Sequence, residues 1–149
     1  MIREANLEDI PRIVEMGRRF VSESTYKEFI FENPEQMGAL AEQVISNPQG
    51  RILISERNGR TVGMLGLIVF PHFLSKELVA GEVMWWVDPE ARAGLTGLKL
   101  MKKAEKIATE MGAVKMQMVA PSKRIGKLYE HFGYVEVERM YQRNLNGGA

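Results

Sequence analysis

Residues 87–101 of the chain read VDPEARAGLTGLKLM. The apolar residues before this stretch predict a β-strand that ends at Val87, and the apolar periodicity after it predicts a long helix from Leu95. A loop of small residues joins the two. The N–H groups at the start of a helix can converge on one anion, and the helix dipole adds to the attraction. The stretch is therefore a candidate pyrophosphate-binding element.

The composition of this loop supports that interpretation. Ala93, Gly94 and Gly97 allow a ligand to approach the backbone closely, and Arg92 can add a positive charge. The alternative is that the two glycines only form a turn and allow close helix packing. No Gly-Lys-Ser/Thr follows, so the loop is not a Walker loop, and the three glycines of the dinucleotide fingerprint are missing.

The rest of the chain predicts an α/β domain with a mixed, mostly antiparallel central sheet flanked by helices. Asn58-Gly59 is a strong hairpin signal between two of its strands. The predicted strands are residues 2–5, 51–57, 61–70, 78–87 and 113–120, and residues 134–144 are predicted as a final strand or a hairpin. The predicted helices are one that follows the N-cap Asn6 and is broken at Ser22, and residues 35–45, 95–111 and 123–131.

Composition limits the possible functions. The 149 residues fit a single domain, residues 1–149, and the net charge of +1 argues against nucleic acid or an acidic membrane as a partner. The chain has no cysteine, which excludes disulfides and thiolate nucleophiles, and its two histidines lack metal-ligand spacing. No apolar run is long enough to span a membrane, and the N-terminus lacks the apolar core of a signal peptide. We expect a cytoplasmic protein without a metal.

Residues 87–97 resemble the acetyl-CoA motif of the GNAT N-acetyltransferases. In that family the loop reads Arg/Gln-x-x-Gly-x-Gly/Ala after a strand that ends in Val-x-Pro. Arg92 matches the first position and Gly97 the last. Leu95 occupies the middle glycine position, and Gly94 stands one residue early, so this chain departs from the family pattern there.

A second segment, residues 121–134, reads PSKRIGKLYEHFGY and resembles a later motif of the same family. Its Leu-Tyr-x-x-x-Gly-aromatic part is intact from Leu128 to Tyr134, and Ser122 occupies the position of an asparagine. The stretches 71–73 and 82–87 look most like small GNATs of bacteria and their phages. The resemblance covers nearly the whole chain and implies the GNAT acyl-CoA N-acyltransferase fold.

The resemblance also implies acetyl-CoA as cosubstrate and gives its binding residues. The backbone of Trp85 and Val87 would contact the pantetheine arm and the acetyl carbonyl, with the N–H of Val87 as oxyanion donor. Ser122 would donate a hydrogen bond to the cofactor. The implied pyrophosphate loop comprises Arg92, Ala93, Gly94, Leu95, Thr96, Gly97 and Leu98.

Two residues are candidates for proton transfer. The tyrosine of the later motif, Tyr129, would protonate the leaving thiolate; otherwise it is a core or rim tyrosine. Glu82, in an apolar surrounding that would raise its pKa, is the candidate general base; otherwise it is a paired structural carboxylate. Simple alternation places Glu82 with Met84 and Trp86, and a β-bulge would break that parity. Gln117, where some relatives have a glutamate, cannot act as a base, which leaves water as an alternative.

The implied function is direct transfer of an acetyl group from acetyl-CoA to a primary amine in a ternary complex. The acceptor would be a small molecule or a peptide, and an exposed final strand would allow a homodimer. The alternative is a catalytically degenerate domain that serves as a CoA sensor, an interaction module or a phage structural protein. Leu95 and Gln117 favour the alternative, whereas Tyr129 favours the enzyme, because a binding-only domain has no need of that phenol.

Overall fold

The computed structural model describes residues 1–147. Residues 1–118 form one compact unit and the residues from Val119 onward form a second. The first unit contains the sheet and three of the α-helices, and the second contains the last α-helix and the C-terminal segment. The expectation that residues 1–149 make up one domain stays a prediction.

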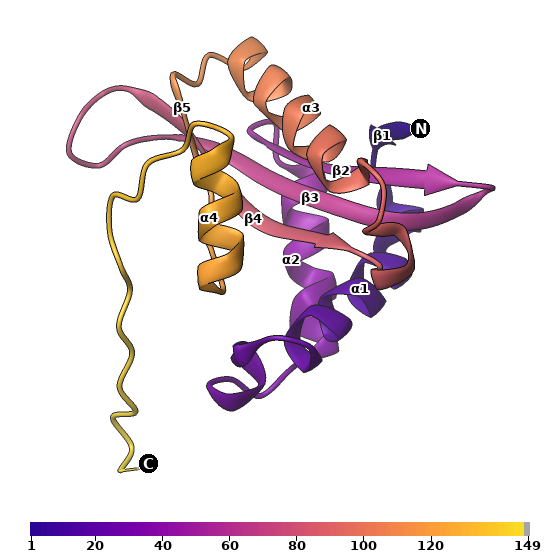
Figure 1. The fold of residues 1–149 in the computed structure, drawn as a ribbon, viewed down its shortest axis with the longest axis horizontal. Coiled ribbons are helices and arrows are strands. Elements are labelled where there is room, and N and C mark those ends of the chain that lie inside the picture. Colours follow the sequence, from indigo (N-terminus) through magenta and orange to yellow (C-terminus); the bar gives the residue numbers. More distant parts are fainter. Residues whose placement is uncertain (148–149) are drawn as a thin grey trace. The chain divides into compact units, whose positions relative to one another are not determined.

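The sheet has five strands in the order β1-β2-β3-β4-β5 (Figure 1). Adjacent strands are antiparallel except β4 and β5, which are parallel. This architecture confirms the predicted mixed, mostly antiparallel sheet flanked by helices. The strands are β1 (Ile2–Glu4), β2 (Gly50–Arg57), β3 (Arg60–Pro71), β4 (Leu78–Val87) and β5 (Lys115–Gln117).

The turn between β2 and β3 is the one that the sequence predicts. Asn58 has φ 53° and Gly59 has φ 74°. Two successive positive φ values match the right-handed twist of a hairpin, and asparagine and glycine are the residues that adopt them at least cost.

The helices also follow local signals in the sequence. Asn6 is an N-cap as expected, but it caps a 3-10 turn that leads into the first α-helix. Asn33 caps the second α-helix, and Pro34 occupies its first position, where a missing N–H costs nothing. The α-helices are α1 (Ile10–Ser22), α2 (Pro34–Ser46), α3 (Thr96–Glu110) and α4 (Lys123–His131). The 3-10 turns are Leu7–Asp9, Thr25–Glu28 and Pro89–Ala91.

Helices cover both faces of the sheet in the first unit (Figure 1). Ile13 of α1 and Val44 of α2 pack in one cluster with Met64 of β3 and Trp86 of β4. On the opposite face α3 lies so close to the sheet that a Cβ on Gly63 would be 3.2 Å from Leu100. The core is therefore divided into two layers by β3 and β4.

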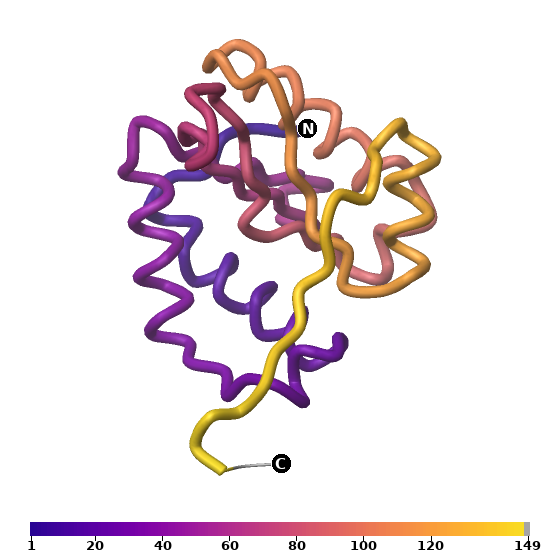
Figure 2. Tube along the Cα trace, turned by 90° about the vertical axis from the view of Figure 1, so that its left-hand side faces the viewer, coloured from indigo at the N-terminus to yellow at the C-terminus, as the bar shows by residue number. Residues whose placement is uncertain are grey.

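One predicted strand is shorter than expected, and another does not form. β5 covers only Lys115–Gln117, because its pairing with β4 ends at Gln117 and the flanking Val114 and Val119 are exposed. Residues 134–144 form no strand, although the segment runs extended in yellow in Figure 2. Four of its apolar side chains are at least 80% exposed: Val135, Val137, Met140 and Tyr141. Alternation predicts a strand only where a neighbour takes up its N–H and C=O groups, and no strand of residues 1–147 does so here.

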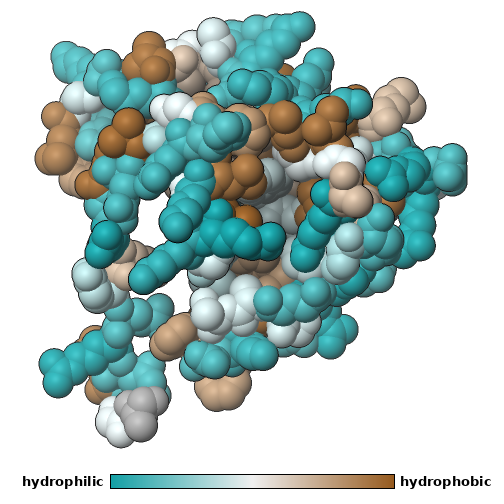
Figure 3. All heavy atoms as spheres, in the orientation of Figure 1, coloured by the Kyte–Doolittle hydropathy of each residue, from teal (hydrophilic) through white to brown (hydrophobic). Residues whose placement is uncertain are grey.

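On the face shown in Figure 3, hydrophilic side chains predominate and hydrophobic ones are scattered among them. No helix within residues 1–147 combines the length and the apolar character that a membrane crossing requires. The homodimer that an exposed final strand would allow stays a prediction.

Candidate active site

A β-bulge in β4 sets the geometry of the candidate site. Met84 pairs with Gly66 of β3, but the next pair joins Glu82 to Leu67, so Val83 is an extra residue. A bulge of this kind reverses which side chains of a strand share a face. It also bends the strand locally and increases its twist.

The bulge moves Glu82 to the face that α3 covers. Leu65 and Leu67 share one face of β3, and they pair with Trp85 and Glu82 respectively. Paired residues of antiparallel strands point to the same face, so Glu82 shares a face with Trp85. Simple alternation with Met84 is therefore wrong, and the bulged alternative is confirmed.

Beyond the bulge, no strand of residues 1–147 pairs with the edge of β4 that faces away from β3, and in this sense the edge is called open. β5 pairs only with Val79–Gly81, and within residues 1–147 no other strand continues along Glu82–Val87. The N–H of Asp88 donates to Val62 of β3 at 2.8 Å. Because successive N–H groups of a strand alternate in direction, the N–H of Val87 points to the open edge, as does that of Trp85. This edge can bind an extended ligand that contains amides.

The open edge leads directly to the start of α3. The helix begins at Thr96 rather than at Leu95, and Leu95 is its N-cap, with no side-chain hydrogen bond. Residues 92–95 form a turn that is exposed to solvent, with Leu95 61% exposed. The first N–H groups of an α-helix have no partner within the helix, so this turn and helix start offer donors to an anion.

The two glycines of the loop have different surroundings. A Cβ on Gly97 would lie 3.2 Å from Cζ2 of Trp85, which is tighter than an ordinary contact. A Cβ on Gly94 would meet only Nη2 of Arg57, at 3.8 Å. The packing interpretation therefore holds for Gly97, whereas the protein leaves room at Gly94 for a ligand to approach.

Arg92 has a structural partner that the sequence does not predict. Its Nε–H donates to the carbonyl oxygen of Val87 at 2.7 Å. Its guanidinium lies over the ring of Trp86, with Cζ 4.6 Å from the ring centroid. The first residue of the turn is thus held against the end of β4 by its own side chain.

Asp88 is the residue that sequence reasoning missed. Its carboxylate is fully buried and accepts hydrogen bonds from Trp86 and from two arginines of α1, Arg12 and Arg19. Those arginines are 76 and 69 residues away along the chain. No local spacing links residues so far apart, so only the fold reveals this cluster.

The two remaining candidates belong to the second unit. Ser122 is the N-cap of α4, and its Oγ accepts the N–H of Ile125 at 3.3 Å. Tyr129 is 5% exposed, and its hydroxyl donates to the carbonyl oxygen of Val119 at 2.9 Å. Both side chains therefore have a structural partner. The first unit brings together the other candidates: Glu82, Trp85, Val87 and the residues from Arg92 to Leu98.

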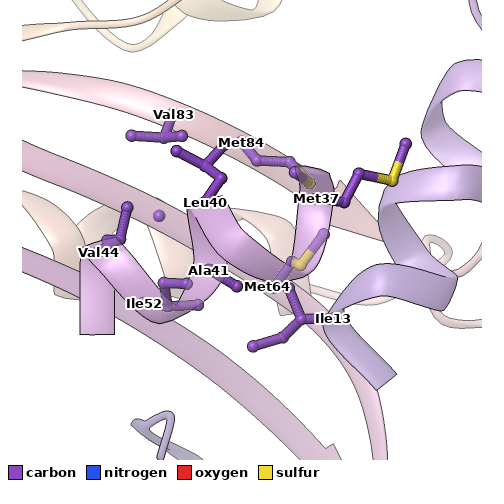
Figure 4. A pocket seen from close by; sticks show the side chains of 10 residues that line it. Ile13, Met37, Leu40, Ala41, Val44, Ile52, Met64, Val83 and Met84 are labelled. Carbon is purple, nitrogen blue, oxygen red and sulfur yellow. The ribbon is translucent and has the colours of Figure 1, made fainter. Parts of the chain in front are cut away.

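A small cavity lies on the other face of the sheet, beside the bulge (Figure 4). Val83 and Met84 of β4 line it together with Met37 and Leu40 of α2. Its volume of about 20 Å³ is close to that of one water molecule, and all of its lining residues are apolar. It contains no titratable group, so it offers no acid–base chemistry.

Comparison with known proteins identifies the family. The acetyltransferase (GNAT) family matches residues 18–134, which is most of the chain. The chain belongs to the GNAT family. This confirms the resemblance drawn from the sequence motifs. Acetyl-CoA is the acetyl donor that this family uses, as the sequence predicted.

Solved structures of GNAT enzymes share the fold. A predicted acetyltransferase of Clostridium acetobutylicum, crystallised with acetyl-CoA, is 18% identical with a TM-score of 0.80, over 99% of this chain and 97% of that one. A ribosomal-protein-alanine N-acetyltransferase of Brucella melitensis is 16% identical with a TM-score of 0.74, over 97% and 99%. An aminoglycoside acetyltransferase from an uncultured soil metagenomic sample, in complex with sisomicin, is 17% identical with a TM-score of 0.71, over 97% and 95%.

At these identities the structural likeness establishes the GNAT fold alone. A comparison with curated proteins gives no match. Within the described residues, no group of three or more His, Cys, Asp and Glu side chains has the arrangement of a metal site.

Proposed function

We propose that this chain is an acetyl-CoA-dependent N-acetyltransferase that transfers the acetyl group directly to a primary amine. One observation carries the proposal. The edge of β4 at residues 82–87, with which no strand of residues 1–147 pairs, runs straight into an exposed turn and a helix start whose first N–H groups have no partner within the helix. Amide donors followed by anion donors match the order of groups in CoA, which has a pantetheine arm and then a pyrophosphate.

Binding relies mainly on the backbone. The edge N–H groups of Trp85 and Val87 take the pantetheine arm and the acetyl carbonyl, and the N–H of Val87 stabilises the oxyanion. The turn and first helical residues, from Arg92 to Leu98, take the pyrophosphate. Gly94 has space for the closest approach, and Leu95 beside it is exposed. Ser122 donates its hydroxyl proton to the cofactor while its oxygen caps α4.

The reaction needs two proton transfers. The amine nitrogen attacks the thioester carbonyl carbon, the C–S bond breaks, and the amine loses one proton while the thiolate gains one. Glu82, which shares the face of Trp85, takes the proton from the amine, directly or through water. Tyr129 is the general acid, since a phenol hydroxyl can protonate a thiolate. No covalent enzyme intermediate is required.

The acceptor class is a primary amine of a small molecule or a peptide. The similar structures include an enzyme for ribosomal-protein alanine and an aminoglycoside enzyme, so the same fold serves both kinds of acceptor. The near-neutral charge of this chain argues mildly against a strongly acidic or polycationic acceptor.

The test is an acetylation assay on the purified chain. Acetyl-CoA is supplied with a panel of peptide, polyamine, aminoglycoside and amino-acid amines, and both free CoA thiol and acetylated product are measured. The proposal predicts product from at least one amine at a rate well above hydrolysis. Tight CoA binding with no product from any amine would instead support the degenerate, binding-only domain.

A further inference from the structure

Asp88 is a buried charge that the proposed chemistry does not use. Its side chain is fully buried at the end of β4. Oδ1 accepts a hydrogen bond from the indole N–H of Trp86, at 2.9 Å, and a second one from Nη1 of Arg19, at 3.1 Å. Oδ2 accepts a hydrogen bond from the guanidinium of Arg12. A buried carboxylate is tolerated only when it is paired and hydrogen-bonded in this way.

The cluster ties three elements together where β4 ends. Arg12 and Arg19 belong to α1, and Arg12 also donates to the carbonyl oxygen of Thr61 in β3, at 2.8 Å from Nη2. Asp88 itself follows β4 and leads into the turn at residues 92–95. The position at which the turn leaves the sheet is therefore set by two arginine side chains of α1, one of which also binds a backbone carbonyl of β3.

Trp86 connects the Asp88 cluster to Arg92, the first residue of the turn. Its indole N–H is held by Asp88, which fixes the orientation of the ring. Guanidinium groups lie over the ring: that of Arg19 at 5.5 Å from the centroid and that of Arg92 at 4.6 Å. The edge of the Arg92 guanidinium is also fixed, because its Nε–H donates a hydrogen bond to the Val87 carbonyl oxygen. A planar guanidinium fixed on both its face and its edge has little freedom.

We propose that Asp88 and Trp86 are positioning residues for acetyl-CoA that act through Arg92. They hold the turn at residues 92–95 in the shape that presents its N–H groups to the pyrophosphate. The inference rests on the proposed function. It gives the side chain of Arg92 an indirect part in binding, through the shape of the turn, rather than that of a mobile phosphate ligand.

Comparing the binding of CoA with the binding of pantetheine distinguishes this positioning role from a general structural role. Pantetheine has the amides of the arm but no phosphate, so it does not use the turn. Trp86→Phe keeps an aromatic ring and removes the donor to Asp88. We expect it to weaken CoA binding about tenfold, which is about 1.4 kcal/mol, and to leave pantetheine binding unchanged. Binding is measured by calorimetry on the full chain, below the melting temperature of each variant.

A second variant and a matched control keep the test independent of folding. Arg92→Ala changes an exposed side chain, and we expect it to reproduce the selective loss of CoA binding. Arg18→Gln alters an arginine of α1 next to Arg19 that pairs with Glu32 outside the cluster, and both ligands should bind it as they bind the wild type. In the double variant Trp86→Phe with Arg92→Ala, the loss should not exceed that of the larger single loss, since one residue acts through the other.

Three outcomes would overturn this inference and leave the proposed function standing. The first is CoA binding that Trp86→Phe does not affect. The second is an equal weakening of CoA binding and pantetheine binding, and the third is a double variant in which the two losses of CoA affinity multiply. A folded wild-type chain that does not bind CoA would instead overturn the proposed function, and the inference with it.

Discussion

Gly97 at the start of α3 lies against Trp85 of β4 so closely that a Cβ on the glycine would be 3.2 Å from Cζ2 of the ring. The same Cβ would be 3.5 Å from Cγ2 of Val87. The contact brings the first turn of the helix next to the open edge of the strand. Amide donors on the strand and anion donors at the helix start thus become neighbours, which is the arrangement that the proposed function requires.

Gly97→Ala should lower the free energy of unfolding by about 1 kcal/mol. Overpacking against Trp85 opposes the gain in helix propensity, which is worth up to about 1 kcal/mol. Urea unfolding measures the difference. Gly94→Ala is the matched control, because its Cβ would be in ordinary contact with Arg57 only, and it should leave stability nearly unchanged. A Gly97→Ala variant that is more stable than the wild type would refute the packing role.

Tyr129→Phe should reduce kcat about 100-fold and leave the Kd of acetyl-CoA nearly unchanged, because the proton donor is lost while the ring remains. The variant should also lose about 1 kcal/mol of stability, since its hydroxyl donates to Val119. Steady-state kinetics and calorimetry measure the two effects. Tyr141→Phe, at a tyrosine that is 86% exposed, is the control. If kcat and affinity fell by the same factor, Tyr129 would be a packing residue only.

Glu82→Gln should reduce kcat by about 100-fold, because an amide cannot accept the proton of the amine. Steady-state kinetics with saturating acetyl-CoA and amine measure the loss. Glu77→Gln is the control, since Glu77 is an exposed carboxylate that pairs with Lys115. A Glu82 variant that keeps the kcat of the wild type would assign deprotonation to another group or to water.

Asp9→Asn should lower stability by about 1 kcal/mol at neutral pH and have little effect in strong acid. Hydrogen bonds from Arg3, at 2.9 Å to each carboxylate oxygen, hold the pKa of Asp9 below its ordinary value of 3.8, against the opposing effect of burial. A depressed pKa contributes stability above the ordinary value, and this contribution is lost as the pH falls through the folded-state pKa.

Urea unfolding of wild type and Asp9→Asn between pH 2 and pH 7 tests this linkage, with the pH range chosen to bracket carboxylate titration. Glu8→Gln, next to it on the same turn, is the control and should show no such pH dependence. An equal loss of stability at both ends of the pH range would mean that Asp9 acts by shape rather than by charge.

Much of the fold could be predicted because its signals are local. Asn58-Gly59 carries its own turn geometry, Asn6 and Asn33 are caps, and the small helix from Lys123 to His131 was predicted with the bounds that the structure gives. The segment 134–144 shows the limit of such signals. Its alternation is typical of a strand, but a strand also needs a neighbour, which no local pattern can supply.

The site was less predictable, for a similar reason. The loop at Arg92 was found because its motif is contiguous in sequence. The side of the sheet on which Glu82 lies depends on one extra residue, Val83, and a bulge has no reliable sequence signature. The cluster at Asp88 joins residues about 70 positions apart, and their types alone do not indicate that they meet.

Acetyl-CoA binding by calorimetry is the most direct test of the central claim, with CoA and ATP titrated in parallel. A GNAT enzyme with the proposed site should bind acetyl-CoA with a Kd of about 1–100 μM and should not bind ATP, which has phosphates but no pantetheine arm. Failure of the folded chain to bind acetyl-CoA, or equal binding of ATP, would contradict the proposed use of the β4 edge and the α3 start.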